Sequence, residues 1–241
     1  MITRHHVVLA LLCSLMISSA VSGFNPVFTF ILMGGTMVGV VLPDIHMKRP
    51  AKTRLLTIAW CIVQSGRITG IPVMCRVYRK FSGRNFDHDD KRLTHSVPGI
   101  FVYFTIITGI VSVPYVLLKN SMPDLPAILL LGAILFGLIL HLVQDLCTRK
   151  GIPVFFPLSE TIIHGSIRPC NLEDNRIWQF QVQHCFLLGI IVILDLIAKP
   201  ADFLIVCGIF GIGICSVSMI LQSDIQVTLP ENQPDFREVP V

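Results

Sequence analysis

The sequence predicts an all-α fold, a polytopic bundle of about six transmembrane helices with cytoplasmic interfacial segments. The 241 residues are 53% hydrophobic and only 14% charged, and their mean hydropathy is +0.72. Soluble domains of this length rarely reach such values, so the composition excludes an ordinary soluble globular protein and indicates an integral membrane protein.

Six apolar segments approach the length of about 20 residues that a helix needs to cross a bilayer. They cover approximately residues 6–21, 27–42, 97–118, 126–143, 185–198 and 203–221. The fifth is short and contains Asp195. For the shorter apolar stretch at 55–66 we expect an interfacial or re-entrant helix. We take residues 1–222 as one membrane-embedded domain. The proline-containing, polar segment 223–241 is expected to be a disordered cytoplasmic tail.

The distribution of Lys and Arg predicts the orientation. Eleven basic residues lie between the second and third segments and four between the fourth and fifth, but the other two connections after the second segment carry one each. Basic loops stay in the cytoplasm. We therefore expect a multi-pass protein with both termini cytoplasmic. This alternation requires the first segment to remain as a helix, although its basic start and small-residue end are also typical of a signal peptide.

The eight cysteines contain no CxxC pair, and most lie in or beside apolar segments. We interpret them as small buried apolar residues. Neither a disulfide framework nor a thiolate zinc site is indicated.

The predicted topology gathers ionisable side chains at one membrane surface. His6 opens the first segment, Asp44 closes the second, His95 opens the third, and His141 and Asp145 close the fourth. The last two are four residues apart and share a helix face. Imidazole and carboxylate groups on facing helices form metal sites in bundles and suit zinc, manganese or iron. We predict that these five residues bind a divalent metal ion, with zinc as the first expectation.

Each of these residues also has a structural explanation. The His141–Asp145 pair is compatible with a simple hydrogen bond, Asp44 after Pro43 with a helix end, and Thr94 with an N-cap of the third segment. Ionisable residues at membrane depth are usually functional, however, and four separate segments supply them at one level. This convergence favours a shared site.

Four short blocks carry a resemblance to a known family. They read LPDIH at 42–46, THS at 94–96, HLVQD at 141–145 and GIPVFFPLS at 151–159. With these blocks the chain resembles the YdjM-like inner-membrane metal-dependent hydrolases, also described as LexA-binding, membrane-associated hydrolases. The resemblance implies an inner (cytoplasmic) membrane location and hydrolase activity.

The resemblance spans residues 6–159, and the last two apolar segments carry no matching block. The chain departs from the family pattern at Asp44-Ile45-His46, where a DIDH-like motif is common, and at Asp90, where a histidine commonly precedes THS. These departures concern residues around the ligands more than the ligands themselves. The order of the five metal-site residues is also similar to that in the zinc-dependent phospholipase C fold and related single-strand nucleases, an analogy that does not fix a substrate.

We therefore expect a membrane-bound metal-dependent hydrolase that cleaves a phosphoester or ester bond of a lipid-like or membrane-proximal substrate. A bound metal ion activates water and polarises the attacked group. Asp44, Asp145 and His95 are the expected catalytic residues, with an aspartate as general base or as a bridge between two ions. The residues expected to support the ligands or bind substrate are His46, Lys91, Arg92, Thr94, Ser96 and Arg149. Phe155 and Phe156 are expected to contact acyl chains or to anchor the chain at the interface.

The alternative is a non-catalytic membrane protein, either a metal-binding transporter or sensor or a scaffold for a cytoplasmic partner. A transporter is expected to place polar residues near the bilayer midplane and often to contain repeats. Here the polar residues lie at helix ends and no repeat is visible; only Asp195 favours transport. Membrane lipids are the expected partners. The basic segments contain no nucleic-acid-binding motif, so nucleic acid is not expected.

Overall fold

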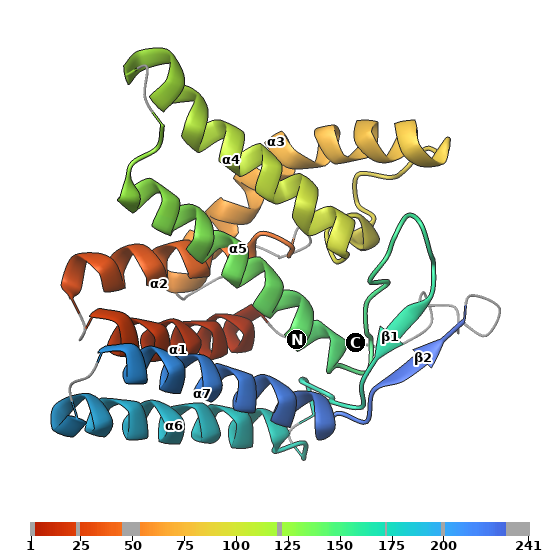
Figure 1. Ribbon diagram of the computed structural model, residues 1–241. Coiled ribbons are helices and arrows are strands. Elements are labelled where there is room, and N and C mark those ends of the chain that lie inside the picture. The colour runs from red at the N-terminus through yellow and green to blue at the C-terminus, as the bar shows by residue number, and fades with distance from the viewer. Residues whose placement is uncertain are drawn as a thin grey trace.

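The computed structural model describes residues 3–22, 25–44, 54–119, 122–171, 173–198 and 201–229. These segments form seven α-helices, one 3-10 helix and two three-residue strands (Figure 1), so the predicted all-α class is confirmed. The elements in chain order are α1 (Thr3–Ser22), α2 (Pro26–Val41), α3 (Arg54–Ser82), η1 (Lys91–Leu93), α4 (Val97–Lys119), α5 (Leu125–Leu146), β1 (Ile162–His164), α6 (Arg176–Ala198), α7 (Ala201–Leu221) and β2 (Gln226–Thr228).

Six helices of the described chain are long and apolar enough to cross a membrane, but they are not the predicted six. The 16 residues of α2 rise only about 24 Å, less than the roughly 30 Å of a hydrocarbon core. The short interfacial helix predicted at 55–66 is wrong, because α3 continues through Pro72 for 29 residues. In its later turns Arg76 and Arg79 are exposed, whereas Ile71 and Met74 are buried. Because charged and apolar residues alternate with the helical period, this part of α3 contains no continuous apolar run.

Small residues allow α2 and α5 to cross at close range. Gly35 on α2 faces Ala133 on α5, Gly39 meets the backbone of Ile134, and Gly137 on α5 meets the backbone of Thr36. A Cβ atom built on Gly35 would lie 2.7 Å from the Cβ of Ala133, closer than real side chains approach. Such spacing lets two helix backbones touch within a membrane. The crossing therefore brings the last turns of both helices together.

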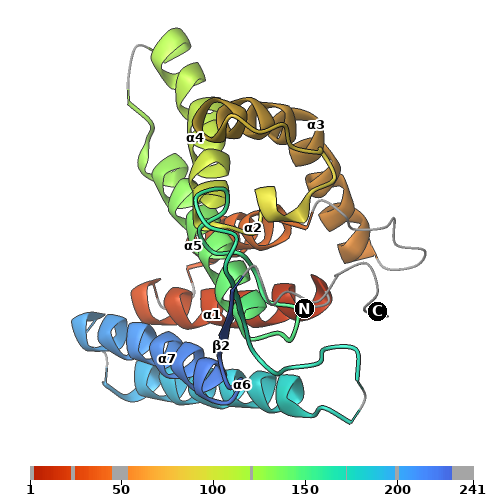
Figure 2. The same ribbon diagram turned by 90° about the vertical axis from the view of Figure 1, so that its right-hand side faces the viewer.

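The remaining helices pack on both sides of this crossing. In Figures 1 and 2, α6 and α7 lie against α1 on one side, and α3 and α4 lie beyond α2 and α5 on the other. All eight cysteines are free thiols, and Cys13, Cys147 and Cys215 are buried as the sequence analysis expected. For Cys61, Cys170 and Cys185, which are exposed, the interpretation as buried residues is wrong, because an apolar segment of a membrane protein also has outward-facing positions and Cys170 lies in the connection before α6.

The segment after α5 is held by the C-terminal strand. β1 pairs with β2 in antiparallel register, with Ile162 opposite Thr228. Residues 223–229 thus have a defined structure, and for them the prediction of a disordered tail is wrong; residues 230–241 lie outside the described chain. The physical reason is composition, because all three prolines of the predicted tail come after residue 229 and leave the strand free to pair.

Arg176 at the start of α6 fastens the same segment. Its guanidinium donates to a carboxylate oxygen of Asp174 at 2.7 Å, to the carbonyl of Ser166 at 3.0 Å and to the carbonyl of Gln222 at 3.2 Å. The hydrogen bonds from Arg176 lower the pKa of Asp174 to about 2. These hydrogen bonds connect the loop after β1, the start of α6 and the end of α7.

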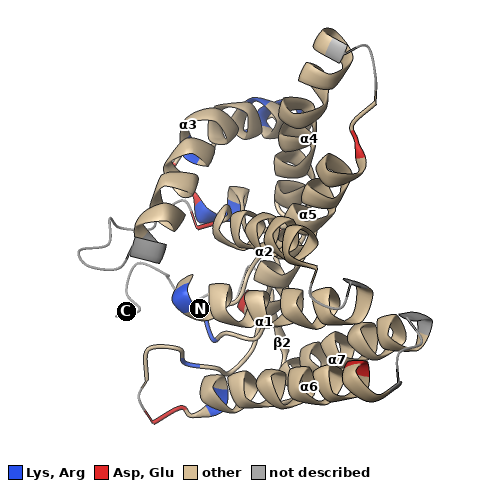
Figure 3. Cartoon of the chain, turned by 90° about the vertical axis from the view of Figure 1, so that its left-hand side faces the viewer, with Lys and Arg blue, Asp and Glu red and all other residues tan. Residues whose placement is uncertain are grey.

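Charged residues are distributed unevenly over the described part of the bundle. Lys and Arg gather on the side of the molecule where α1 begins (Figure 3). Asp124 lies in the connection before α5, and Asp195 lies in α6. A bundle with one basic end agrees with the charge asymmetry from which the orientation was predicted.

Candidate metal centre

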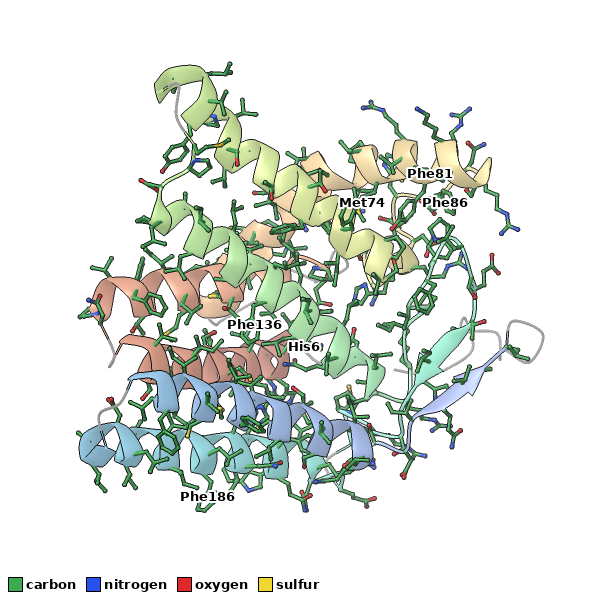
Figure 4. The ribbon with its side chains drawn as sticks, viewed as in Figure 1. His6, Met74, Phe81, Phe86, Phe136 and Phe186 are labelled. Carbon is green, nitrogen blue, oxygen red and sulfur yellow. The ribbon has the colours of Figure 1, made fainter. Side chains whose placement is uncertain are left out.

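The five predicted ligands come from four segments and meet in one place. His6 lies in α1, Asp44 follows α2, His95 precedes α4, and His141 and Asp145 lie in the last turns of α5. His6 and His141 are completely buried, and His6 lies between α1 and α5 (Figure 4). The side chains of His95, Asp145 and Asp44 are 8%, 11% and 17% exposed. The cluster is therefore buried on one side and accessible along the other.

The carboxylate of Asp145 is at the middle of the cluster. Its Oδ1 lies 3.1 Å from Nε2 of His6, and its Oδ2 lies 3.4 Å from Nε2 of His141 and 3.5 Å from Nε2 of His95. Asp44 is farther out, with its Oδ1 3.8 Å from Nε2 of His95. The same ring nitrogen of each of the three histidines faces the Asp145 carboxylate.

The opposite ring nitrogens are held by acceptors. Nδ1 of His141 donates to the carbonyl of Val40 at 2.6 Å, and Nδ1 of His95 lies 3.1 Å from the carbonyl of Lys91. Nδ1 of His6 lies 2.7 Å from Oε1 of Gln144. Because a backbone carbonyl only accepts, its partner nitrogen carries the proton. In the neutral imidazoles the Nε2 lone pairs are then free.

The Nε2 lone pairs of His6 and His141 point toward the carboxylate of Asp145. Apart from the Asp145 carboxylate that they face, neither Nε2 of His6 nor Nε2 of His141 has a hydrogen-bond partner among the described residues. The rings of His6 and His141 are stacked with their centroids 4.3 Å apart, so protonating both would place like charges face to face. A buried polar atom without a partner costs about 1–3 kcal/mol. A cation between the nitrogens and the carboxylate would remove both penalties.

The spacing of the donors suits such an ion. Zinc lies about 2.0–2.2 Å from nitrogen and oxygen ligands, which in a tetrahedral arrangement separates the ligand atoms by roughly 3.3 Å. The Nε2 atoms of the three histidines lie 3.1–3.5 Å from the Asp145 oxygens. Two overlapping groups, His6 with His141 and Asp145, and Asp44 with His95 and His141, each bring their ligand atoms within 4.8 Å of one another.

Asp44 has a separate partner. The hydroxyl of Thr3 donates to its Oδ2 at 2.5 Å. Burial opposes ionisation of Asp44, but the neighbouring imidazoles, that of His95 above all, outweigh burial and hold the pKa of Asp44 below its ordinary range. Asp44 is therefore a carboxylate at neutral pH, the form that binds metal ions.

A protein-family comparison covers nearly all of the helical region. Residues 1–220 match the family described as YdjM inner membrane protein. The chain belongs to this family. The match extends through α6 and α7, which carried no recognisable block in the sequence. Together with the six apolar helices it identifies an inner-membrane protein family of helical architecture. No curated protein and no solved structure matches the chain.

Thr94 and Ser96, both buried, have different partners. The Oγ1 of Thr94 donates to the carbonyl of Pro43 at 2.9 Å and lies 3.0 Å from Nδ1 of His95, so it links the Asp44 segment to the histidine. Ser96 instead accepts from the backbone N–H of Gly99 at 3.1 Å. Ser96, rather than Thr94, therefore caps α4.

The basic residues predicted to bind substrate also differ in their surroundings. Arg92 donates from Nε and Nη2 to both carboxylate oxygens of Asp90 and lies over the ring of Phe156, so its charge is already paired. Lys91 and Arg149 are exposed. His46 lies outside the described residues.

Sequence reasoning missed Gln144, the carbonyl of Val40, Thr3 and Lys150. Burial and the charge of Lys91 lower the pKa of Lys150, while the charge of Asp145 acts in the opposite direction. Of these four, only Gln144 could have been recognised in the sequence, since a polar residue directly before Asp145 on an apolar helix is unusual.

The two phenylalanines of the loop have opposite environments. Phe156 is 2% exposed and packs against Tyr78 and Phe86, whereas Phe155 is 56% exposed. The expectation that both residues contact lipid is therefore wrong for Phe156, because its ring fills the core between α3 and the loop.

Proposed function

We propose that this protein is a membrane-bound metal-dependent hydrolase that acts on a phosphoester or ester bond of a lipid-like substrate. The observation that carries the proposal is the convergence of three imidazole Nε2 atoms on the carboxylate of Asp145, with their Nδ1 atoms held by other groups. A cation held between them would bind the Nε2 lone pairs and the carboxylate of Asp145 at the same time.

The proposed ligands are His6, His95, His141 and Asp145, with zinc as the first expectation and manganese or iron as alternatives. When bound, the ion supplies a Lewis acid that makes water more acidic and polarises the phosphoryl or acyl oxygen. Val40, Lys91 and Gln144 keep the imidazole rings in the ligating orientation through their Nδ1 atoms.

Asp44 is the farthest and most exposed of the five donors, so with the ion held by the three histidines and Asp145 we assign the proton of the attacking water to Asp44 as general base rather than ligand. The water oxygen forms a bond to phosphorus or to the acyl carbon while its proton passes to Asp44. The bond to the leaving alkoxide then breaks, and Asp44 returns the proton to that oxygen. Asp44 is a weak base on its own, and the acidified water makes the transfer accessible.

Lys91 and Lys150 are the residues that we assign to an anionic group of the substrate. Both belong to the exposed edge of the centre, and the charge of Asp145 acts on Lys150. Arg92 is less suited, since Asp90 already binds its guanidinium. A phosphate group beside two lysines gains charge-assisted hydrogen bonds.

We also propose that the centre faces the cytoplasm. The basic residues lie at the end of the bundle where α1 begins, and such segments stay cytoplasmic. Accessibility to a membrane-impermeant thiol reagent of a cysteine introduced in place of Arg4, in a variant with Cys61, Cys170 and Cys185 replaced by serine, tests this orientation. Labelling in everted but not in intact right-side-out vesicles is the expected result.

Metal content of the purified protein tests the function first. The comparison includes the wild type, His141→Ala, Asp145→Ala and the control His184→Ala, which removes another buried histidine whose Nδ1 donates to the carbonyl of Phe180 in α6. We expect stoichiometric metal in the wild type and in His184→Ala and a loss of at least tenfold in the other two.

Hydrolysis assays with phosphoester and ester substrates follow on the metal-loaded protein. Activity lost in His141→Ala, Asp145→Ala and Asp44→Asn, but kept in His184→Ala, supports the assignment. Folded wild-type protein that contains no metal and takes none up on reconstitution would overturn the proposal.

A further inference from the structure

Two hollows lie between α3 and α4. The first, about 350 Å³, is lined by residues of α2, α3 and α4, and the second, about 690 Å³, by α3, α4 and the tip of the loop at Pro157 and Leu158. Both are bordered by Ile106. Cavities of about 300–1,000 Å³ are typical of small-molecule sites. We call the two together the α3–α4 groove.

The shape of the groove follows from α3. Gly66 and Gly70 leave room for the ring of Tyr103, because a Cβ on Gly70 would lie 2.6 Å from that ring. In Figure 2, α3 is bent, so that its later half reaches α4 and its first half lies away from it. The lining is almost entirely apolar, and the hydroxyls of Ser65 and Thr69 donate to carbonyls of their own helix.

Tyr103 is the exception in this lining. It is 2% exposed, and its hydroxyl has no hydrogen-bond partner among the described residues. A Cβ on Gly66 would lie 3.8 Å from that hydroxyl and 2.8 Å from a methyl carbon of Leu42, which comes two residues before Asp44. A donor in an apolar hollow without water is costly unless a ligand accepts its proton. The unpaired hydroxyl therefore points to a ligand with an acceptor oxygen near the metal centre.

We propose that the α3–α4 groove binds one acyl chain of a glycerophospholipid, with the ester carbonyl of that chain accepting a hydrogen bond from Tyr103. The substrate class of the proposed hydrolase is then a diacyl phospholipid. This step rests on the proposed function, but binding of the lipid itself does not.

The surroundings of the groove favour a membrane phospholipid over a soluble ligand. Phe81, Phe101 and Leu158 line it and are 78%, 70% and 81% exposed, as expected for residues in contact with acyl chains. Arg79 and Lys80 in the last turn of α3 are exposed beside Phe81 and complement an anionic headgroup. Val97, two residues after His95, lines the second hollow, so the groove begins at the metal-binding segment.

A photoreactive phospholipid tests the site directly. The protein is reconstituted in phosphatidylcholine vesicles containing phosphatidylglycerol with a diazirine in one acyl chain, and cross-linked peptides are identified by mass spectrometry. Tyr103→Phe removes only the hydroxyl, Ser65→Trp fills the first hollow, and Tyr115→Phe removes a hydroxyl of the same helix that donates to Asp124 outside the groove.

We expect labelling to concentrate on α3 and α4 and to fall about five- to tenfold in Tyr103→Phe, the size of one hydrogen bond. Ser65→Trp should decrease it at least as much, and Tyr115→Phe should leave it unchanged. Labelling spread equally over the groove and the exposed face of α6 around Phe186, and unchanged in Tyr103→Phe, identifies ordinary bilayer contact and overturns the proposal.

Metal content and hydrolysis of bis(p-nitrophenyl) phosphate, measured on the same preparations, separate this inference from the proposed function. Groove-specific labelling of a metal-free, inactive protein supports the lipid site and contradicts the hydrolase. Active, metal-loaded protein whose labelling and KM for long-chain phospholipid are the same in Tyr103→Phe and wild type contradicts the lipid site and leaves the hydrolase standing.

Discussion

Gly137→Ala tests whether the crossing of α2 and α5 sets the geometry of the metal centre. The new Cβ would lie 2.3 Å from the carbonyl oxygen of Thr36 and 2.8 Å from the backbone nitrogen of Val40. Because ordinary contact begins at 3.4 Å, the helices have to separate by about 1.1 Å at Thr36 and about 0.6 Å at Val40. We expect overpacking of this kind to lower the free energy of unfolding by about 1–3 kcal/mol.

The same displacement acts on the centre, because the carbonyl of Val40 accepts the Nδ1 proton of His141 at 2.6 Å. Loss of a partner that orients a ligating histidine typically lowers metal affinity about 10–100-fold. Thermal unfolding in detergent, with and without added zinc, measures the stability, and competition with a zinc chelator measures the affinity.

Gly132→Ala is the matched control on the same helix. Gly132 is exposed, and a Cβ there meets nothing within 4 Å. Both substitutions gain the same helix preference of alanine over glycine, about 1 kcal/mol, so the difference between them isolates the crossing. Equal unfolding temperatures and equal zinc affinities for the two variants would refute the reasoning.

Three further predictions follow from single contacts. Gln144→Leu removes the acceptor of His6 and should weaken zinc binding about 10–100-fold in the same chelator assay; unchanged affinity would contradict an orienting role. Phe156→Ala should lower the free energy of unfolding by about 3–5 kcal/mol and Phe155→Ala by less than about 1 kcal/mol, as measured by denaturant unfolding; similar losses would show that both rings are outside the core. The pKa of Asp174 is lowered to about 2, so its ion pair with Arg176 stabilises the fold above about pH 4, and this contribution is lost as the pH falls towards 2. The difference in the free energy of unfolding between wild type and Asp174→Asn should therefore shrink over that interval. A constant difference would contradict the pairing.

The sequence was most informative about the ligands. His141 and Asp145 were predicted to share a helix face because their spacing matches one helical turn, and the structure brings them together with His6, Asp44 and His95. Their convergence was predictable because ionisable groups on apolar helices have few structural uses. The roles assigned to these residues stay a proposal until metal binding is measured.

The groups that orient the ligands were not predictable in the same way. The carbonyls of Val40 and Lys91 belong to the backbone and have no signature in the side-chain pattern. The pairing of Arg92 with Asp90 and the burial of Phe156 depend on how a loop folds back, which short blocks of sequence do not encode. Helix α3 was missed because its arginines interrupt an apolar run without interrupting the helix.

The distance along the chain between His6 and its partners has a consequence for biosynthesis. His6 and Gln144 are 138 residues apart, and at 5–20 residues per second a ribosome needs about 7–28 s to reach the second after the first. During that interval the imidazole in α1 has neither its acceptor nor the carboxylate of Asp145. The centre is therefore assembled late, once α5 has joined helices already synthesised, and any ion it holds enters a nearly complete bundle rather than guiding the first helices into place.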